Sequence, residues 1–406
     1  MAHACTGLVT TKNPPYKKSA ATAPRSVFAA TANAQITTTM TLNRFISCAM
    51  LFAVTTMLVA QGIALPFSRL DILFAGDLMQ HQSQLDAALQ ADGHYSYSAC
   101  YRHIRGTVSA ADVAVANLET TIGTANYGGY PSFCAPDSFL HAVKDAGFDV
   151  MLFANNHCLD RGKRGALYTL DKMDTLGIMH CGVYRDSTDR ANRYPLMVEK
   201  RGIRIAILNY TYGTNGIEPP APIVVNYIDK KQIATDIDKA KTLNADVIIA
   251  CMHWGSEYVS LPPKNIRAMA DWLLSQGVTH VIGGHPHVLQ PMELRQANYM
   301  SSNNAVVYSL GNLLSGMYLR GRDGGALVNL ELHKLYDTTY LRSLSYMLTW
   351  VARPQRDNVD NFVILKAAAP PQGLADGAYK KLSEFVSESR LLFQKHNKGH
   401  IIELTR

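Results

Sequence analysis

Short apolar runs alternate with amphipathic segments from about residue 71 to residue 310, and this alternation limits the fold more than any other feature. The apolar runs are bounded by a charge or a Gly, which predicts buried strands; they are 71–76, 113–117, 149–154, 246–252, 279–284 and 305–310. The amphipathic segments predict helices, several ending before Gly or Asn; they are 139–147, 165–177, 231–244 and 264–277. Such alternation predicts an α/β fold with a largely parallel sheet. Residues 196–210 predict instead a hairpin that turns at 200–202.

Polar side chains stand at or just after the ends of five of these predicted strands. Ligands in open α/β sheets gather at the carboxyl ends of the strands, so we expect these side chains to converge. Each alone is explained as simply by a helix cap or a turn, but five together favour one shared site. Carboxylate, amide and imidazole donors without thiolates suit Mn, Fe or Zn. The residues are Asp77, Asn117 with Glu119, Asn156 with His157, His253, and His285 with His287.

The pair His285 and His287 lies in the stretch "VIGGHPHVLQP". In an extended segment, side chains at i and i+2 point to the same side, so the two imidazoles could bind one transition-metal ion together. The alternative is a pair of loop histidines that hydrogen-bond to water or backbone.

The first 70 residues contain no Asp or Glu. Residues 40–61 combine Arg44, an apolar run from Phe45 to Ala60 and small residues after it, which is typical of a signal peptide; the run is short for a permanent membrane span. We therefore expect Met40 to be the true start, residues 1–39 to be a non-native or disordered leader, and the mature protein to be secreted or periplasmic, in the cell envelope. An amphipathic transit-type leader is the alternative.

Removing this leader changes the charge balance of the chain. The basic count falls from 39 to 34 against 32 acids, so the net charge falls from +7 to +2, which gives no indication of a nucleic-acid partner. Five cysteines remain, and their spacing matches no zinc-binding pattern. If one disulfide forms in an oxidising compartment, we expect it between Cys100 and Cys134, because both fall in loop-like sequence.

The motif series GD…NLE…NNH…HWG…GGHPH, with "YSLGN" further on, resembles the CapA/PgsA family of bacterial poly-γ-glutamate capsule synthesis proteins, a branch of the calcineurin-like metallophosphoesterases. The resemblance implies a four-layer α/β/β/α sandwich with two facing mixed sheets, over about residues 70–335. Residues 336–406 would form a C-terminal extension that packs on the same domain, including a final helix from about 376 to 395.

The resemblance also implies roles for individual residues. One or two divalent metal ions would be held by ligands of which Glu119 takes the bridging position. His157 would contact the scissile phosphate and protonate the leaving group. The ligands carried over from the family are Asp77, Glu119, Asn156, His253, His285 and His287.

Two positions depart from the superfamily pattern. Met79 stands where the first motif has a histidine ligand, and Glu119 replaces an aspartate. His81 could substitute as a metal ligand if residues 77–81 are helical, since i and i+4 share a face; a surface histidine is the alternative. Asp160 could orient His157, as carboxylates behind such histidines do, or it could cap the next helix.

Three functions follow as hypotheses. The first is a secreted metal-dependent phosphoesterase-like hydrolase linked to poly-γ-glutamate or another cell-envelope polymer, with an envelope polymer or phosphoester as substrate and the capsule-synthesis machinery as a partner. The second is a non-catalytic accessory protein of surface-polymer assembly or export. The third is a γ-glutamyl amide hydrolase or transferase, because an activated water could also attack a carbonyl.

Overall fold

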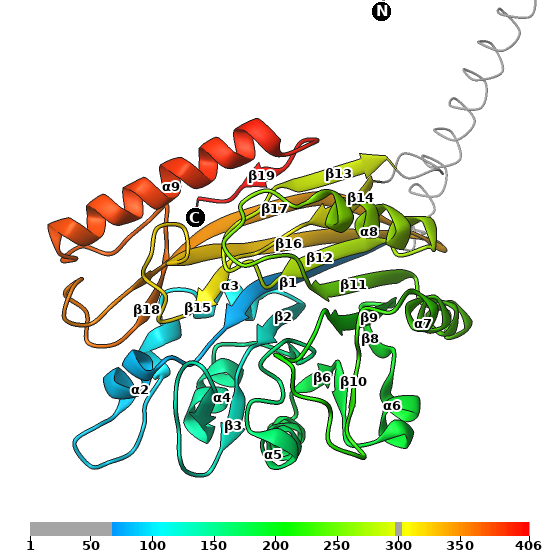
Figure 1. The fold of residues 1–406 in the computed structure, drawn as a ribbon. Helices are drawn as coiled ribbons and strands as arrows, with labels where there is room; N and C mark the ends of the chain where they lie inside the picture. Colours follow the sequence, from blue (N-terminus) through cyan, green and yellow to red (C-terminus); the bar gives the residue numbers. More distant parts are fainter. Residues whose placement is uncertain (1–66, 297–302, 406) are drawn as a thin grey trace, which may run out of the picture. The chain divides into compact units, whose positions relative to one another are not determined.

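Two mixed β-sheets pack face to face at the centre of the protein (Figure 1). The structure, a computed structural model, describes residues 67–296 and 303–405, so the expected leader and signal peptide lie outside the described residues. The nine-stranded sheet has the order β18 (Val363–Lys366), β17 (Thr338–Ala352), β16 (Gly324–Leu335), β1 (Phe67–Leu78), β2 (Val113–Leu118), β5 (Val150–Leu152), β6 (Met179–Cys181), with β15 (Asn312–Leu314) on β1 and β19 (Ile402–Glu403) on β17.

The second sheet carries the other strands that end at the site. Its order is β13 (Met292–Gln296), β14 (Asn303–Val307), β12 (His280–Gly284), β11 (Val247–His253), β9 (Ile203–Thr211), β8 (Leu196–Lys200). In the nine-stranded sheet, β1 and β2 are parallel, whereas β16 and β17 are antiparallel. In the six-stranded sheet, β11 and β12 are parallel, whereas β8 and β9 at one edge are antiparallel. Two small sheets pair β3 (Thr121–Gly123) with β4 (Cys134–Pro136) and β7 (Val183–Tyr184) with β10 (Val224–Val225).

Helices cover the outer faces, so the expected four-layer α/β/β/α arrangement is confirmed. Along β1, Leu70, Ile72 and Phe74 face the second sheet, while the alternate residues Leu73 and Ala75 face the helices, as the two-residue period of a strand requires. The helical elements are α2 (Gln82–Ala88), η1 (Ser98–Tyr101), α3 (Arg105–Ala110), α4 (Asp137–Asp145), α5 (Gly162–Thr175), α6 (Ser187–Arg193), α7 (Lys230–Thr242), α8 (Lys264–Ser275) and α9 (Asp376–His396).

The outer helices divide between the two sheets. Helices α4 and α5 pack on the nine-stranded sheet, whereas α7 and α8 pack on the six-stranded sheet. Helix α9 lies across β17 (Figure 1). No helix within 67–296 and 303–405 combines the length and the apolar character that crossing a membrane requires.

The strand predicted at 305–310 is shorter than expected. Strand β14 ends at Val307, because the chain then leaves the six-stranded sheet and crosses to β15 in the nine-stranded sheet. The crossing segment passes close to two glycines. A Cβ on Gly76 would overlap the Gly311 carbonyl oxygen, and a Cβ on Gly283 would overlap the Tyr308 carbonyl oxygen. Both positions therefore require glycine for close backbone approach.

Residues 336–405 complete the nine-stranded sheet. Strand β17 pairs with β16 along its length, and β18 adds the edge. Trp350 and Leu365 from this segment are buried in the same core as the inter-sheet residues. The segment belongs to one compact unit with the rest of the described chain.

The expected disulfide between Cys100 and Cys134 is wrong. Both residues are free thiols, as are the other described cysteines. The reason is that neither lies in a loop: Cys100 belongs to η1 and Cys134 to β4, and both are buried. Burial raises the pKa of the Cys100 thiol to about 12.

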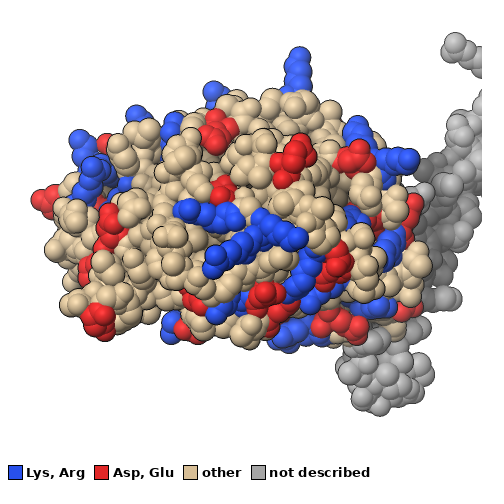
Figure 2. Space-filling model, turned by 60° about the horizontal axis from the view of Figure 1, so that its bottom comes forward, with Lys and Arg blue, Asp and Glu red and all other residues tan. Residues whose placement is uncertain are grey.

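Charges are mixed on the face of the molecule that Figure 2 shows. Lys and Arg side chains lie among Asp and Glu side chains there, and much of this face carries neither.

Candidate metal centre

Two buried carboxylates form one side of the site. Asp77, at the carboxyl end of β1, accepts a hydrogen bond from Asn117 Nδ2 at 2.8 Å through Oδ1, and its Oδ2 lies 3.1 Å from His287 Nδ1. Glu119 follows β2, and its backbone N–H donates to the Leu78 carbonyl at 2.9 Å. Both side chains are fully buried.

Imidazoles from the six-stranded sheet form the other side. His253 ends β11, and its Nε2 lies 2.7 Å from Asn156 Oδ1 and 3.7 Å from Glu119 Oε1. His287 Nε2 lies 3.8 Å from the same Glu119 oxygen. The ring of His285 lies 4.8 Å from that of His253. One carboxylate oxygen of Glu119 therefore lies among imidazoles from two different strand ends.

His285 and His287 converge by a route that the sequence reasoning did not foresee. We expected an extended segment, but β12 ends at Gly284 and both histidines have positive φ, 96° for His285 and 55° for His287. Non-glycine residues rarely adopt this backbone conformation, and such strain is concentrated at functional sites. The turn aims both imidazoles at the carboxylates, and the His285 N–H lies 3.4 Å from Asp77 Oδ2.

The donor set fits a divalent metal. Glu119 with His285 and His287, and Asp77 with Glu119 and His253, each bring their ligand atoms within 4.8 Å of one another. Glu119 Oε1 and His285 Nδ1 are buried and have no hydrogen-bond partner within the described part of the chain. No Lys or Arg among residues 67–296 and 303–405 pairs with Asp77 or Glu119. Buried anionic oxygens without a cationic partner are costly, and a bound cation would remove that cost.

The electrostatics agree with this assignment. Burial, with the Asp77 carboxylate next in effect, raises the pKa of Glu119 well above its usual value. Burial and the neighbouring imidazoles hold the pKa of His253 well below its usual range and lower that of His285 to about 4. His253 and His285 are therefore neutral at pH 7, which is the form that binds metals.

His157 and Asp160 form a pair beside the cluster. His157 Nδ1 lies 2.7 Å from Asp160 Oδ2, and the same oxygen accepts the Phe133 N–H at 2.7 Å. Asp160 is not a helix cap, because α5 begins at Gly162 with Arg161 in the capping position. The geometry thus matches the orienting role that we considered for Asp160. The Phe133 ring packs on the imidazole at a centroid distance of 4.5 Å.

His81 lies outside the two ligand groups. The condition for its metal binding, a helix over residues 77–81, is not met, because β1 continues to Leu78 and α2 begins only at Gln82. Its Nδ1 accepts the Gly316 N–H at 3.2 Å, and its ring packs on Phe133. Met79 is buried next to β1.

Three asparagines that we did not assign as metal ligands form hydrogen bonds around the ligands. Asn117 Nδ2 lies between Asp77 Oδ1 and Glu119 Oε2, at 2.8 and 3.3 Å. Asn155 Nδ2 donates to Asn117 Oδ1 at 3.1 Å. Asn312 Oδ1 lies 3.0 Å from His287 Nδ1. The signal was present in the sequence, since these residues belong to the quoted motifs NLE, NNH and YSLGN.

The fold and the site together define a class: a two-sheet α/β sandwich with a buried carboxylate and histidine cluster at the carboxyl ends of its strands. The sequence model of the family described as "Bacterial capsule synthesis protein PGA_cap" matches residues 71–317. The chain belongs to this family, which confirms the resemblance seen in the motifs.

Proteins from several bacteria are similar in sequence to part of this chain. It is 26% identical to the capsule biosynthesis protein CapA of Bacillus anthracis over 65% of this chain and 64% of that one. It is 30% identical to the PGA biosynthesis protein CapA of Bacillus subtilis over 47% of this chain and 49% of that one. It thus spans between about half and two thirds of the length of these relatives. A probable polyglutamine synthesis accessory protein of Mycobacterium tuberculosis is 25% identical over 57% of this chain and 62% of that one.

Among solved structures, the calcineurin-like phosphoesterase YfkN of Bacillus subtilis is similar with a TM-score of 0.42 and 15% identity, over 80% of this chain and 98% of that one.

Proposed function

We propose that the protein is a secreted metal-dependent hydrolase of the phosphoesterase type that acts in capsule or cell-envelope polymer biosynthesis. One observation carries the proposal: Glu119 Oε1 and His285 Nδ1 are buried without a partner among the described residues, inside a cluster of carboxylates and imidazoles. A site built of such atoms, beside a histidine held by a carboxylate, has the parts that metal-assisted hydrolysis requires.

The ligand oxygens and nitrogens suit Mn, Fe or Zn, and no thiolate is involved. Asp77, Glu119, Asn156 and the three histidines would hold one or two ions, and Glu119 belongs to both ligand groups. A metal bound there would supply an activated water at neutral pH and polarise the oxygens of the substrate.

The protein's own contribution centres on His157. Its Nδ1–H donates to Asp160, which fixes the orientation of the ring and stabilises the imidazolium form. This leaves Nε2 as the nitrogen that donates a proton to the leaving oxygen. Phe133 packs on the ring and limits its rotation. Tyr212 packs beside the site, with its ring 4.5 Å from that of His285.

The names of the relatives, which link them to capsule, PGA and polyglutamine synthesis, support a role in the synthesis of a surface polymer. We propose an envelope polymer or its phosphoester precursor as substrate, the capsule-synthesis machinery as partner, and the periplasm or cell surface as location.

A second candidate is a non-catalytic accessory protein that keeps this site for assembly. Met79 favours it: a buried thioether stands where the resemblance implies an imidazole ligand, so one ion would have fewer ligands.

Metal analysis of the purified protein, with a phosphodiesterase assay after addition of Mn²⁺, Fe²⁺ or Zn²⁺, tests the proposal. We expect one or two equivalents of metal and turnover of a small chromogenic phosphodiester. Bound metal without turnover on any phosphoester would favour the accessory protein. A protein that binds no metal would contradict the hydrolase and leave only the accessory protein.

A further inference from the structure

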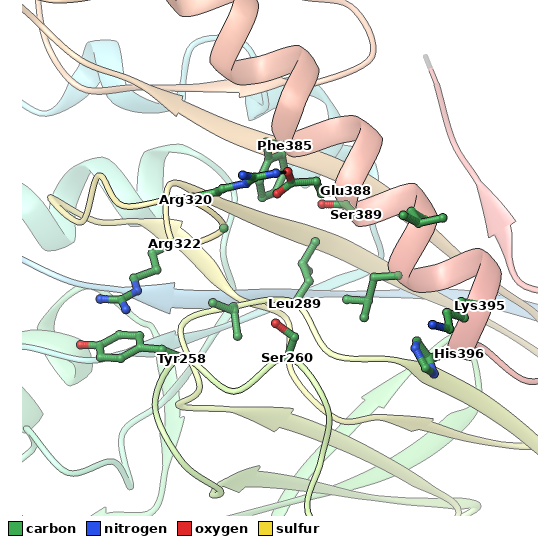
Figure 3. Close-up of a pocket in the computed structure, with 14 residues that line it drawn as sticks. Tyr258, Ser260, Leu289, Arg320, Arg322, Phe385, Glu388, Ser389, Lys395 and His396 are labelled. Carbon is green, nitrogen blue, oxygen red and sulfur yellow. Dashed lines mark ion pairs between the residues drawn. The ribbon is translucent and has the colours of Figure 1, made fainter.

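A second feature of the surface is a groove that begins beside the metal centre. It has a volume of about 400 Å³ and runs between α9 and two loops, one around Tyr258 and one around Arg322 (Figure 3). Its walls are mixed: Leu289, Phe385 and neighbouring aliphatic side chains give it an apolar floor, and charged side chains stand at its sides.

The chain that follows the His285–His287 turn forms part of the groove wall. Val288 and Leu289 line the groove and directly follow the ligand His287. The Tyr258 N–H donates to the Pro286 carbonyl at 2.8 Å, and its ring lies 6.1 Å from that of His287. The end of the groove at Tyr258 therefore lies close to the candidate ligand His287.

The charge in the groove is positive in excess. Arg320 and Glu388 form an ion pair across it and neutralise each other. Arg322 lies over the Tyr258 ring, 3.3 Å from the centroid, and neither it nor Lys395 has a carboxylate partner within the described residues. Stacking on an aromatic ring leaves the N–H groups at the edge of a guanidinium available to an anion. Figure 3 places Arg322 at one end of the groove and Lys395 with His396 at the other.

The length of the groove suits several monomers. Phe385 and His396 are eleven positions apart on α9, which corresponds to about 16 Å at the rise of an α-helix. An extended γ-glutamyl unit is longer than the roughly 3.5 Å of an α-peptide unit by two methylenes, so about three units would fit. Their methylenes would lie on the apolar floor and their carboxylates would face the cations.

We propose that this groove binds the carboxylate-bearing chain of a γ-linked glutamate polymer as it leads to or from the metal centre. The proposal rests on the proposed function for the identity of the reacting site, but binding in the groove is separable from the reaction. The apolar floor favours this methylene-rich chain over a phosphodiester polymer, whose backbone is more polar.

Fluorescence anisotropy with a labelled γ-linked glutamate oligomer tests the groove. Arg322→Gln combined with Lys395→Gln should weaken oligomer binding about tenfold, and added salt should weaken binding to the wild type, because these ion pairs are solvent-accessible. Lys380→Gln on α9 is the matched control, since Lys380 is exposed and does not line the groove. Oligomer binding to this control should equal that of the wild type.

Lys395 and His396 also lie in the last turn of α9, where cations stabilise a helix. If that were their whole role, the double variant would melt at lower temperature but bind the oligomer unchanged, and the proposal would be wrong. Failure of the wild type to bind at low salt, or stronger competition by poly(glycerol phosphate) than by unlabelled oligomer, would also overturn it. Loss of oligomer binding in the double variant, with small-phosphodiester turnover unchanged or absent in every form of the protein, supports the groove whatever the outcome for hydrolysis.

Discussion

The contact between Asp160 and His157 yields a prediction that separates charge from geometry. Asp160 Oδ2 accepts two hydrogen bonds at 2.7 Å, from His157 Nδ1 and from the Phe133 N–H, and its side chain is almost fully buried. In Asp160→Asn the amide oxygen can still accept both bonds, so the variant removes the negative charge and keeps the shape. In Asp160→Ala both donors lose their acceptor.

The expected magnitudes differ accordingly. A hydrogen bond to a charged group contributes about 1.5–3 kcal/mol and a neutral one about 0.5–1.5 kcal/mol, so Asp160→Asn should lose about 1–1.5 kcal/mol of imidazolium stabilisation. That loss corresponds to about a tenfold lower kcat. Asp160→Ala also leaves the Phe133 N–H unsatisfied and frees the ring, so the free energy of unfolding should fall by about 1–3 kcal/mol and kcat by about 10²–10³.

The assay is hydrolysis of a small phosphodiester, with bound metal and urea unfolding measured on the same samples. Metal content should stay at the wild-type level in both variants, because Asp160 contacts none of the ligand atoms that we assign. If Asp160→Asn were as slow as Asp160→Ala, the charge would not be separable from the geometry. If both variants kept wild-type kcat while losing stability, Asp160 would be a structural residue and the assignment of His157 as proton donor would be refuted.

Further predictions concern the ligands, a close backbone approach and a buried histidine. His157→Ala should keep its metal and lose roughly 10²–10⁴ in rate, whereas His285→Ala should lose metal and activity together; exposed His141→Ala is the control, and elemental analysis with kinetics distinguishes them. Gly76→Ala should destabilise the fold by about 3 kcal/mol or more, seen as a lower Tm, because its Cβ would overlap a backbone carbonyl of the crossing segment. Burial lowers the pKa of His280 to about 3. Below about pH 6.5 the unfolded chain therefore takes up a proton on His280, whereas the folded chain does not, so the free energy of unfolding falls as the pH falls. Urea unfolding of protein treated with a chelator should show that His280→Gln loses about 2 kcal/mol less stability than the wild type between pH 7 and 5.

The parallel strands and the convergence of the site residues were predictable from the sequence. Buried parallel strands give continuous apolar runs, and their carboxyl ends meet at one edge, so residues as distant as Asp77 and His285 were expected together. The hairpin also follows from local signals: β8 and β9 join through Arg201 and Gly202, both with positive φ. The pairing of the two sheets came only from the family resemblance, because no local pattern specifies which face a sheet packs against.

Other features depend on contacts that a linear sequence does not specify. The left-handed backbone at His285 and His287 is not a local preference of either residue and persists only because the surrounding structure requires it. The end of β14 at Val307 reflects a crossing between sheets, although Tyr308 and Leu310 after it are still apolar and buried. The role of Asn117 emerges only when β1 and β2 lie side by side, since its amide then reaches Asp77.

The oxygen donors and the imidazoles of the candidate site come from opposite sheets. Asp77, Glu119 and Asn156 lie at or just after the ends of strands of the nine-stranded sheet, whereas His253 and the His285–His287 pair lie at or just after the ends of strands of the six-stranded sheet. A bound ion would consequently be coordinated by both sheets at once, and its dissociation constant would depend on the relative position of the two sheets. Trimming a side chain in the interface between them, such as Ile282→Ala, would let the sheets shift and would loosen the ion, although no ligand had been altered. The metal affinity of this protein would thus report how well the two sheets pack against each other.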